Sequence, residues 1–415
     1  MTRTHANTTH GGARGLRAPD PCVTRLGFAD LFHAVELHGD DALRDTLATV
    51  LPDWGCAPSP GNLAPGTPVT RVRRDDGEYG FQSWWATAPL TKLGVAGATC
   101  GVVADLVQAY LDARPGVFGL HCGAVRLGGQ LVAFTGPYRA GKTTLVTRLG
   151  TEPGGELFCD DVLPIAPDGM AVALGVQPRL RLPLPDTMPD GFRAFVGRNL
   201  TVHDHRYGYV ALPGQAAFGT RAPLAALILL SRQPGAKARF HRLDTSEAAA
   251  HLIRQNIADP GEVEAHYDRV SALAEGMACL TLVYSDLEDA VALVRTAFDG
   301  TAQAPRIADP GPPLDRTAAQ EDADPADMDV MFRRSGDVVE RVIGSDTFLW
   351  QMDGRHFFSL NPVGGAVWTL LETPASGHDI AAALHAAFPD VPRAVIAGDT
   401  ARLLGQMHRR GLLTA

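Results

Sequence analysis

The stretch Gly136-Pro-Tyr-Arg-Ala-Gly-Lys142-Thr143 decides how the middle of this chain folds. It fits the pattern G-x-x-x-x-G-K-[ST], the phosphate-binding P-loop or Walker A motif. An apolar run of strand length, residues 130–135, precedes it, and residues 142–149 have the composition of a short helix. Strand, glycine loop and helix in this order are the context that the motif needs. The alternative is a chance glycine-rich turn, which would require neither neighbour.

The chemistry expected of this loop is nucleotide binding. Two glycines let the loop curl so that backbone N–H groups point at phosphate oxygens, and the helix N-terminus adds positive charge. Lys142 is expected to reach the β- and γ-phosphates, and the Thr143 hydroxyl to ligate Mg²⁺. The residues expected to bind ATP or another nucleoside triphosphate are Gly136, Pro137, Tyr138, Arg139, Ala140, Gly141, Lys142, Thr143 and Thr144.

Two adjacent carboxylates follow the next apolar run. Residues 156–159 read as a strand that ends in Asp160 and Asp161, and Asp160 comes only 18 residues after Lys142. Beside a P-loop, such a strand end carries a Mg²⁺-binding acid or a catalytic base. The alternative is a turn with solvated carboxylates. We favour a functional role, and the sequence leaves open which of the two acids is the base.

Composition sets limits on the rest of the chain. It has 415 residues, 45% apolar and 20% charged, so several soluble domains are expected. The net charge of −9 does not suggest nucleic-acid binding. No apolar run is long enough for a bilayer and none resembles a signal peptide, so we expect a cytoplasmic protein that does not bind membranes. The six scattered cysteines indicate reduced thiols and no zinc site.

The pattern of apolar runs and breakers predicts five segments. In the N-terminal region we expect helices at 28–35, 40–50 and 100–113 and a hairpin over 69–85 that turns at Asp76-Gly77. The segments are a disordered tail (1–20), an N-terminal α+β region (21–116), a nucleotide-binding domain (117–300), an acidic Pro-rich linker (301–330) and a small third domain (331–415).

Within the nucleotide-binding domain, residues 177–209 hold five arginines, and their prolines argue against regular structure. This segment reads either as a loop that covers phosphates or an acidic substrate, or as a solvated loop.

The third domain has the outline of a winged helix-turn-helix. Three strands are expected at 338–343, 347–352 and 356–360, followed by three helices, with Asp379 as a candidate N-cap of the second. DNA binding is the common use of this outline, but the domain has no dense basic patch. A sheet with an accessible edge offers a second use, because an extended peptide can add to it as a further strand.

Residues 119–165 resemble the kinase domain of HPr kinase/phosphorylase. The resemblance is carried by Leu120-His121, a hairpin, Gly136–Thr143 and Cys159-Asp160-Asp161, in that order and at that spacing. It implies an α/β P-loop kinase core of the HPr kinase/PEP carboxykinase type. In that family, the Asp after the strand is the general base, its neighbour and the P-loop hydroxyl organise Mg²⁺, and the His lies near the phosphates.

Carried onto this chain, the resemblance implies four catalytic residues and two magnesium ligands. The chain departs from the family at Thr144, where the bacterial regulator has Glu, so neither phosphorylase activity nor HPr as a substrate is predicted. The implied catalytic residues are Asp160, His121, Lys142 and Asp161, and the implied magnesium ligands are Thr143 and Asp161.

The third domain is similar to PqqD, the leader-peptide recognition element of ribosomal peptide biosynthesis. The similarity lies in Ser359-Leu-Asn361-Pro-Val-Gly364-Gly-Ala-Val-Trp368-Thr-Leu-Leu371 and in Gly411-Leu412-Leu413. It implies that a leader peptide adds to the third strand and lies against the third helix. The implied peptide-binding residues are His356, Phe357, Phe358, Ser359, Leu360, Leu403 and Met407.

Together these features predict an ATP-dependent kinase that phosphorylates a Ser or Thr hydroxyl of a precursor peptide, as in lasso-peptide tailoring. Two alternatives remain open. One is a nucleotide-binding module that delivers peptide without kinase activity, and the other is a small-molecule kinase. Relatives of the kinase family assemble as oligomers, so a homo-oligomer is left open too.

Overall fold

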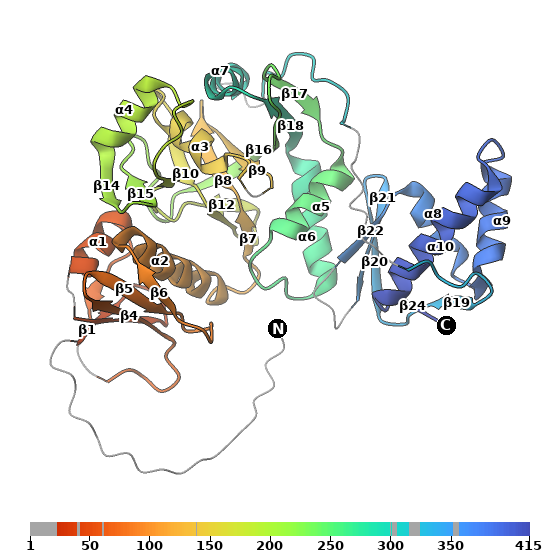
Figure 1. Ribbon diagram of the computed structural model, residues 1–415, viewed down its shortest axis with the longest axis horizontal. Helices are drawn as coiled ribbons and strands as arrows, with labels where there is room; N and C mark the ends of the chain where they lie inside the picture. Colours follow the sequence, from red (N-terminus) through yellow and green to blue (C-terminus); the bar gives the residue numbers. More distant parts are fainter. Residues whose placement is uncertain are drawn as a thin grey trace, which may run out of the picture.

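The computed structural model describes residues 23–39, 42–59, 62–137, 139–298, 300, 305–314, 324–351 and 357–415. The tail predicted to be disordered, residues 1–20, lies outside them. An N-terminal unit, a central unit and a C-terminal unit follow one another along the molecule (Figure 1). Among the described residues, the structure has no helix that is long and apolar enough to cross a membrane.

The N-terminal unit is a sheet of six strands with two helices packed on it. Its elements are β1 (Val23–Gly27), β2 (Ala34–His38), α1 (Ala42–Val50), β3 (Ala57–Pro58), β4 (Val69–Asp75), β5 (Glu78–Gln82), β6 (Leu90–Leu93) and α2 (Val95–Asp112). The strand order is β3-β1-β2-β4-β5-β6. The expected helix at 40–50 and the hairpin over 69–85 are confirmed, and the third expected helix begins earlier, at Val95.

The helix expected at 28–35 is wrong. Residues 34–38 form β2, in which buried Val35 and Leu37 alternate with the less buried Glu36. Asp30 has φ of +59°, which no α-helix accommodates. The apolar spacing that suggested a helix therefore comes from a turn followed by a strand.

The central unit is built on a nine-stranded sheet. Its strands are β7 (Phe118–His121), β8 (Gly123–Leu127), β9 (Gln130–Thr135), β10 (Glu156–Cys159), β11 (Val162–Ile165), β12 (Met170–Val172), β16 (Arg221–Arg232), β17 (Arg239–Arg242) and β18 (Ala278–Tyr284). The long strand β16 pairs in parallel with β9 and β18, and its first residues pair antiparallel with β12. The hairpin β8–β9, turning at Gly128-Gly129, leads into the glycine loop as expected.

Four helices of the central unit are α3 (Lys142–Gly150), α5 (Thr245–Gln255), α6 (Val263–Gly276) and α7 (Leu287–Phe298). The strand expected at 117–126 is divided in two at Cys122. The first part, β7, pairs with β11 and not with β9. This division places the end of β7 beside the turn that carries the two carboxylates.

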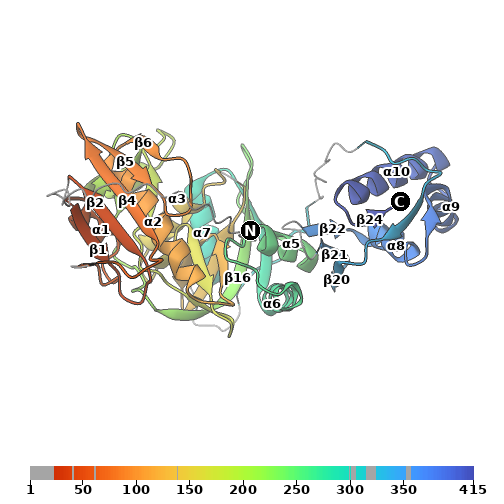
Figure 2. The same cartoon turned by 90° about the horizontal axis from the view of Figure 1, so that it is seen from below.

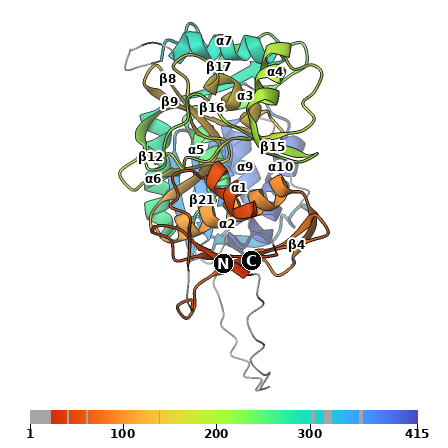
Figure 3. The same ribbon diagram turned by 90° about the vertical axis from the view of Figure 1, so that its left-hand side faces the viewer.

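Residues 177–209 are regular, which corrects the expectation of a loop. They form β13 (Arg179–Arg181), α4 (Asp190–Asn199), β14 (Leu200–His203) and β15 (Tyr207–Val210), with strand order β13-β15-β14. Pro178 precedes β13, Pro183 and Pro185 lie between β13 and α4, and Pro189 is the N-cap residue of α4, so no proline lies inside one of these strands or the helix. This small sheet lies directly above α1 and α2 (Figures 1 and 3).

The C-terminal unit matches the predicted order of strands and helices. Its elements are β19 (Met331–Arg334), β20 (Val338–Ile343), β21 (Asp346–Gln351), β22 (Phe357–Leu360), α8 (Pro362–Leu370), β23 (Ala375–Ser376), α9 (Gly377–Ala387), α10 (Arg393–Arg409) and β24 (Leu413–Thr414). Asp379 is not the N-cap of α9. Ser376 is, and Asp379 completes a capping box as the third helical residue.

The sheet β20-β21-β22 is packed on both faces. Leu349 and Leu360 lie in the core of the C-terminal unit, whereas Phe348 and Trp350 belong to a core shared with α5 and α6. Trp350 contacts His266 and Tyr267 edge-on, with ring centroids 5.6 and 6.0 Å apart. The C-terminal unit is therefore docked on the central unit, as Figure 2 shows.

Part of the expected linker also contacts the central unit. Gly311 donates a hydrogen bond to the carbonyl of Phe240 and accepts one from Arg242, each 2.9 Å long. Residues 305–314 thus run beside β17. Residues 301–304 and 315–323 lie outside the described residues.

Candidate functional site

The loop Gly136–Gly141 joins β9 to α3, and a side chain at the end of β18 holds it in place. The hydroxyl of Tyr284, the last residue of β18, donates a 2.9 Å hydrogen bond to the carbonyl of Ala140. Gly141 has φ of +93°, and a Cβ there would lie 2.8 Å from the Tyr284 hydroxyl. Position 141 therefore needs glycine both for its backbone and for its space. Tyr138 lies outside the described residues.

Lys142 begins α3 and reaches back across the loop. Its Nζ donates a 3.1 Å hydrogen bond to the carbonyl of Gly136. Burial lowers the pKa of Lys142, and the negative charge of Asp161 opposes this shift. Further along α3, Arg148 is paired with Glu288 of α7 at 2.6 Å, which links the two helices. Thr143 and Thr144 are half-buried in the first turn.

Asp160 and Asp161 occupy the turn between β10 and β11, in different surroundings. Asp160 is half-buried and accepts a 2.8 Å hydrogen bond from the backbone N–H of Arg179. Burial, reinforced by the charge of Asp161, raises the pKa of Asp160 to about 7. Asp161 is exposed, and its Oδ1 lies 3.2 Å from Nε2 of His121. The hydrogen bond from His121 lowers the pKa of Asp161.

The structure brings the four expected catalytic residues within electrostatic reach of one another. His121 ends β7, and the backbone N–H of Cys122 binds the carbonyl of Asp161, which fixes the turn. The charge of Asp161 raises the pKa of Lys142 and the charge of Lys142 lowers that of Asp161, so the acid turn and the glycine loop interact electrostatically. A carboxyl with a pKa near 7 suits general-base catalysis at neutral pH.

A magnesium ion would find suitable donors here. Mg²⁺ prefers hard oxygen ligands and keeps several waters, so one hydroxyl and one carboxylate suffice from the protein. Thr143 and the exposed Asp161 supply this pair. No cluster of three or more His, Cys, Asp or Glu forms a metal site within the described part of the chain.

Three contributions to the site come from contacts between residues that are far apart in the sequence. The backbone N–H of Arg179, the first residue of β13 in the small β13-β15-β14 sheet, binds Asp160. The guanidinium carbon of Arg179 lies 4.5 Å from the ring centroid of Tyr207. Tyr284 is recognisable only as the end of an apolar strand. The contacts of Arg179, Tyr207 and Tyr284 with the site become visible only in the folded structure.

The expected peptide-binding residues divide into accessible and buried groups. Phe357, Phe358 and Ser359 of β22 are half-buried, and Leu403 of α10 is partly buried. Leu360 is 2% exposed and Met407 is fully buried, so both contribute to the core in this conformation. His356 lies outside the described residues. In the sheet, β22 pairs with β21 on one side, and no other described strand pairs with its second edge.

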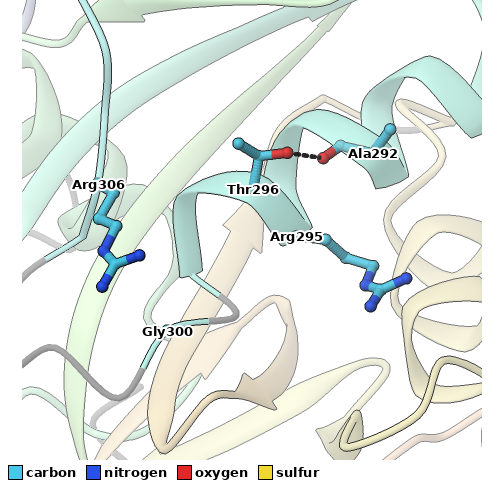
Figure 4. A pocket seen from close by; sticks show the side chains of 5 residues that line it. All are labelled: Ala292, Arg295, Thr296, Gly300 and Arg306. Atoms are coloured by element: carbon cyan, nitrogen blue, oxygen red, sulfur yellow. Dashed lines mark hydrogen bonds between the residues drawn. The ribbon is translucent and has the colours of Figure 1, made fainter.

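A surface hollow beside the end of α7 is separate from this site (Figure 4). Ala292, Arg295, Thr296, Gly300 and Arg306 line it. Arg295 is ion-paired with Glu152, and the Thr296 hydroxyl donates to the carbonyl of Ala292 at 2.8 Å. The two polar groups from α7 are thus engaged within the protein, and none of the described residues that line the hollow is a carboxylate.

Comparisons with known proteins bear on the C-terminal unit. Residues 347–413 match the family described as Coenzyme PQQ synthesis protein D (PqqD). The expected PqqD resemblance is confirmed over these residues, from β21 to β24. A solved structure described as "TbiB1 in Complex with the TbiA(beta) Leader Peptide" is similar at 26% identity, over 20% of this chain and 95% of that chain, with a TM-score of 0.19. No curated protein matches the chain, and the HPr kinase resemblance stays a prediction.

The pKa of Asp160 makes a testable prediction about stability. Because folding raises this pKa from an ordinary 3.8 to about 7, the neutral acid is favoured, and wild type loses stability as pH rises between these values. Asp160→Asn cannot ionise. As pH rises from 4 to 8, the free energy of unfolding of Asp160→Asn should therefore increase by up to about 4 kcal/mol relative to that of wild type, as measured by urea unfolding.

Asp161→Asn is the matched control with the opposite sign. The pKa of Asp161 is lowered, so its ionised form stabilises the fold above the ordinary pKa, and the variant should lose stability relative to wild type as pH rises. Parallel unfolding curves for Asp160→Asn and wild type would contradict the raised pKa.

Proposed function

We propose that this protein is an ATP-dependent kinase that phosphorylates a Ser or Thr hydroxyl of a ribosomally synthesised precursor peptide. In this proposal the C-terminal unit binds the leader of the peptide and the central unit carries out the transfer. One observation carries it: a PqqD-matching unit, in which no described strand pairs with the second edge of β22, is docked on the unit that holds the glycine loop and the two carboxylates. Reduced thiols and a cytoplasmic location belong to the same proposal.

The leader would bind along the second edge of β22. An extended peptide placed there pairs its backbone with the free N–H and C=O groups of the strand, and side-chain pockets give specificity. Phe358 lies beside the guanidinium of Arg410, at 5.6 Å, and Phe357 beside that of Arg254, at 5.4 Å. The two aromatic rings therefore flank the edge from opposite faces of the sheet.

The transfer step follows from the surroundings of the two carboxylates. Asp160, with a pKa near 7, accepts the proton of the substrate hydroxyl. The hydroxyl oxygen forms a bond to the γ-phosphorus as the bond from that phosphorus to the bridging oxygen breaks, and ADP leaves with the electron pair. Lys142, and Arg139 or Arg179, would stabilise the negative charge. Magnesium held by Thr143 and Asp161 would supply charge neutralisation on the phosphates.

Docking of the C-terminal unit on the central unit supports the proposal that one unit binds the leader and the other transfers the phosphoryl group. A leader bound to a unit packed on α5 and α6 raises the effective concentration of the attached core segment near the central unit. Asn256, directly after α5, accepts a 3.0 Å hydrogen bond from the N–H of Gly119 in β7. The surface that carries the C-terminal unit is thereby joined to the strand that ends in His121.

Two other functions use the same residues. A delivery module would bind nucleotide and leader without phosphoryl transfer, and a small-molecule kinase would use the catalytic site without the leader. The buried environment that raises the pKa of Asp160 favours catalysis over simple nucleotide binding. The peptide kinase, the delivery module and the small-molecule kinase differ in whether phosphate is transferred and to which acceptor.

Leader binding predicts a local change in amide hydrogen exchange. When a precursor peptide is added, the backbone amides of β22 should exchange more slowly, because their outward groups become hydrogen-bonded. The opposite edge strand of the same sheet, β20, provides the control and should be unchanged. Protection of β20 alone, or of neither strand, would contradict the proposed docking edge.

Kinase activity predicts a phosphate-mass gain on the precursor peptide after incubation with Mg-ATP. Lys142→Ala and Asp160→Asn should lower the rate by about 10² to 10⁴-fold, because they remove phosphate contact and general base. Both variants should still bind peptide, which calorimetry can verify. Peptide binding without any mass gain in wild type would favour the delivery module. A phosphate gain on small-molecule acceptors alone would favour the small-molecule kinase.

A further inference from the structure

Arg179 is a cation without an acidic partner beside two carboxylates. Its backbone N–H binds Asp160, but within the described residues its guanidinium forms no ion pair and no side-chain hydrogen bond. The side chain is half-buried, and its charge acts on both Asp160 and Asp161. A guanidinium has five N–H donors in a planar fork, a geometry that matches phosphate oxygens.

The position of Arg179 is set by its neighbours on the small sheet. β13 pairs with β15 so that Arg179 lies opposite Tyr209, and Arg181 lies opposite Tyr207. The guanidinium carbon stays 4.5 Å from the Tyr207 ring centroid, and this contact limits the rotamers available to a long side chain. Arg181, two residues further, is exposed.

Asp204 connects this arrangement to the N-terminal unit. One of its carboxylate oxygens accepts hydrogen bonds from the backbone N–H groups of Arg206 and Tyr207, at 2.8 and 2.9 Å. The other accepts a 3.1 Å hydrogen bond from the N–H of Gly97 in the first turn of α2. A Cβ on Gly94 would lie 2.4 Å from Asp204, so the contact also needs glycine at the start of that helix.

We infer that Arg179 binds the oxygens of the phosphoryl group being transferred, and that the N-terminal unit positions it through Asp204 and Tyr207. This inference rests on the proposed function. It assigns a role to residues 23–112, which the sequence alone did not explain. Arg179 would contact the γ-phosphoryl oxygens and Lys142 the loop side of the phosphates, while Asp160 takes the proton of the acceptor.

The test compares kinetics and nucleotide binding in five variants. Arg179→Ala should lower kcat by about 100-fold or more, as removal of a preorganised charge donor does. Its ADP affinity should stay within about twofold of wild type, because ADP lacks the γ-phosphoryl group that Arg179 binds. Arg181→Ala is the matched control on the same strand and should leave both quantities unchanged.

Two substitutions of Tyr207 and one of Asp204 test the residues that position Arg179. Tyr207→Phe keeps the ring and should retain kcat, whereas Tyr207→Leu and Asp204→Asn should each lower kcat by about tenfold with ADP affinity kept. Equal kcat in Arg179→Ala and Arg181→Ala, or an equal loss of ADP affinity, overturns the inference alone. A wild-type protein that transfers no phosphate to any acceptor overturns the proposed function and the inference together.

Discussion

The pairing of β16 is the constraint on which the rest of the structure depends. This strand joins two halves of the central sheet that would otherwise be separate. Its second half lies parallel to β9 and β18, and its first residues pair with β12, which leads through β11 to β7. The register shifts between Leu224 and Ala226, where the partner changes. Because of this change, β7, which ends in His121, belongs to the same sheet as β9, which leads into the glycine loop.

The different burial of Asp160 and Asp161 also gives the two carboxyl groups different pKa values. Their backbones are adjacent, yet Asp160 is turned into the protein and Asp161 toward solvent and His121. Two like charges so close cannot both ionise easily, and the more buried one therefore keeps its proton to higher pH. The division into a base and a metal-binding acid, which the sequence left open, gains a physical basis from these environments.

The sequence predicted the elements with strong local signals. The glycine loop, the β8–β9 hairpin and most of the C-terminal unit follow from apolar periodicity and turn residues. Long-range partners were missed. Nothing near Tyr284 or Asp204 indicates that their side chains contact Ala140 and α2. The prolines of 177–209 were misread, because proline position relative to each element matters more than proline number.

We propose that the glycine loop and the acid turn form one phosphoryl-transfer site. The most direct measurement is a crystal structure with Mn²⁺ and a non-hydrolysable ATP analogue, with the metal located by its anomalous signal. We expect the β- and γ-phosphates inside loop 136–143, the metal at Thr143 and Asp161, and Asp160 facing the γ-phosphorus. A nucleotide bound elsewhere, or phosphates in the loop with the carboxylates turned away, would contradict it.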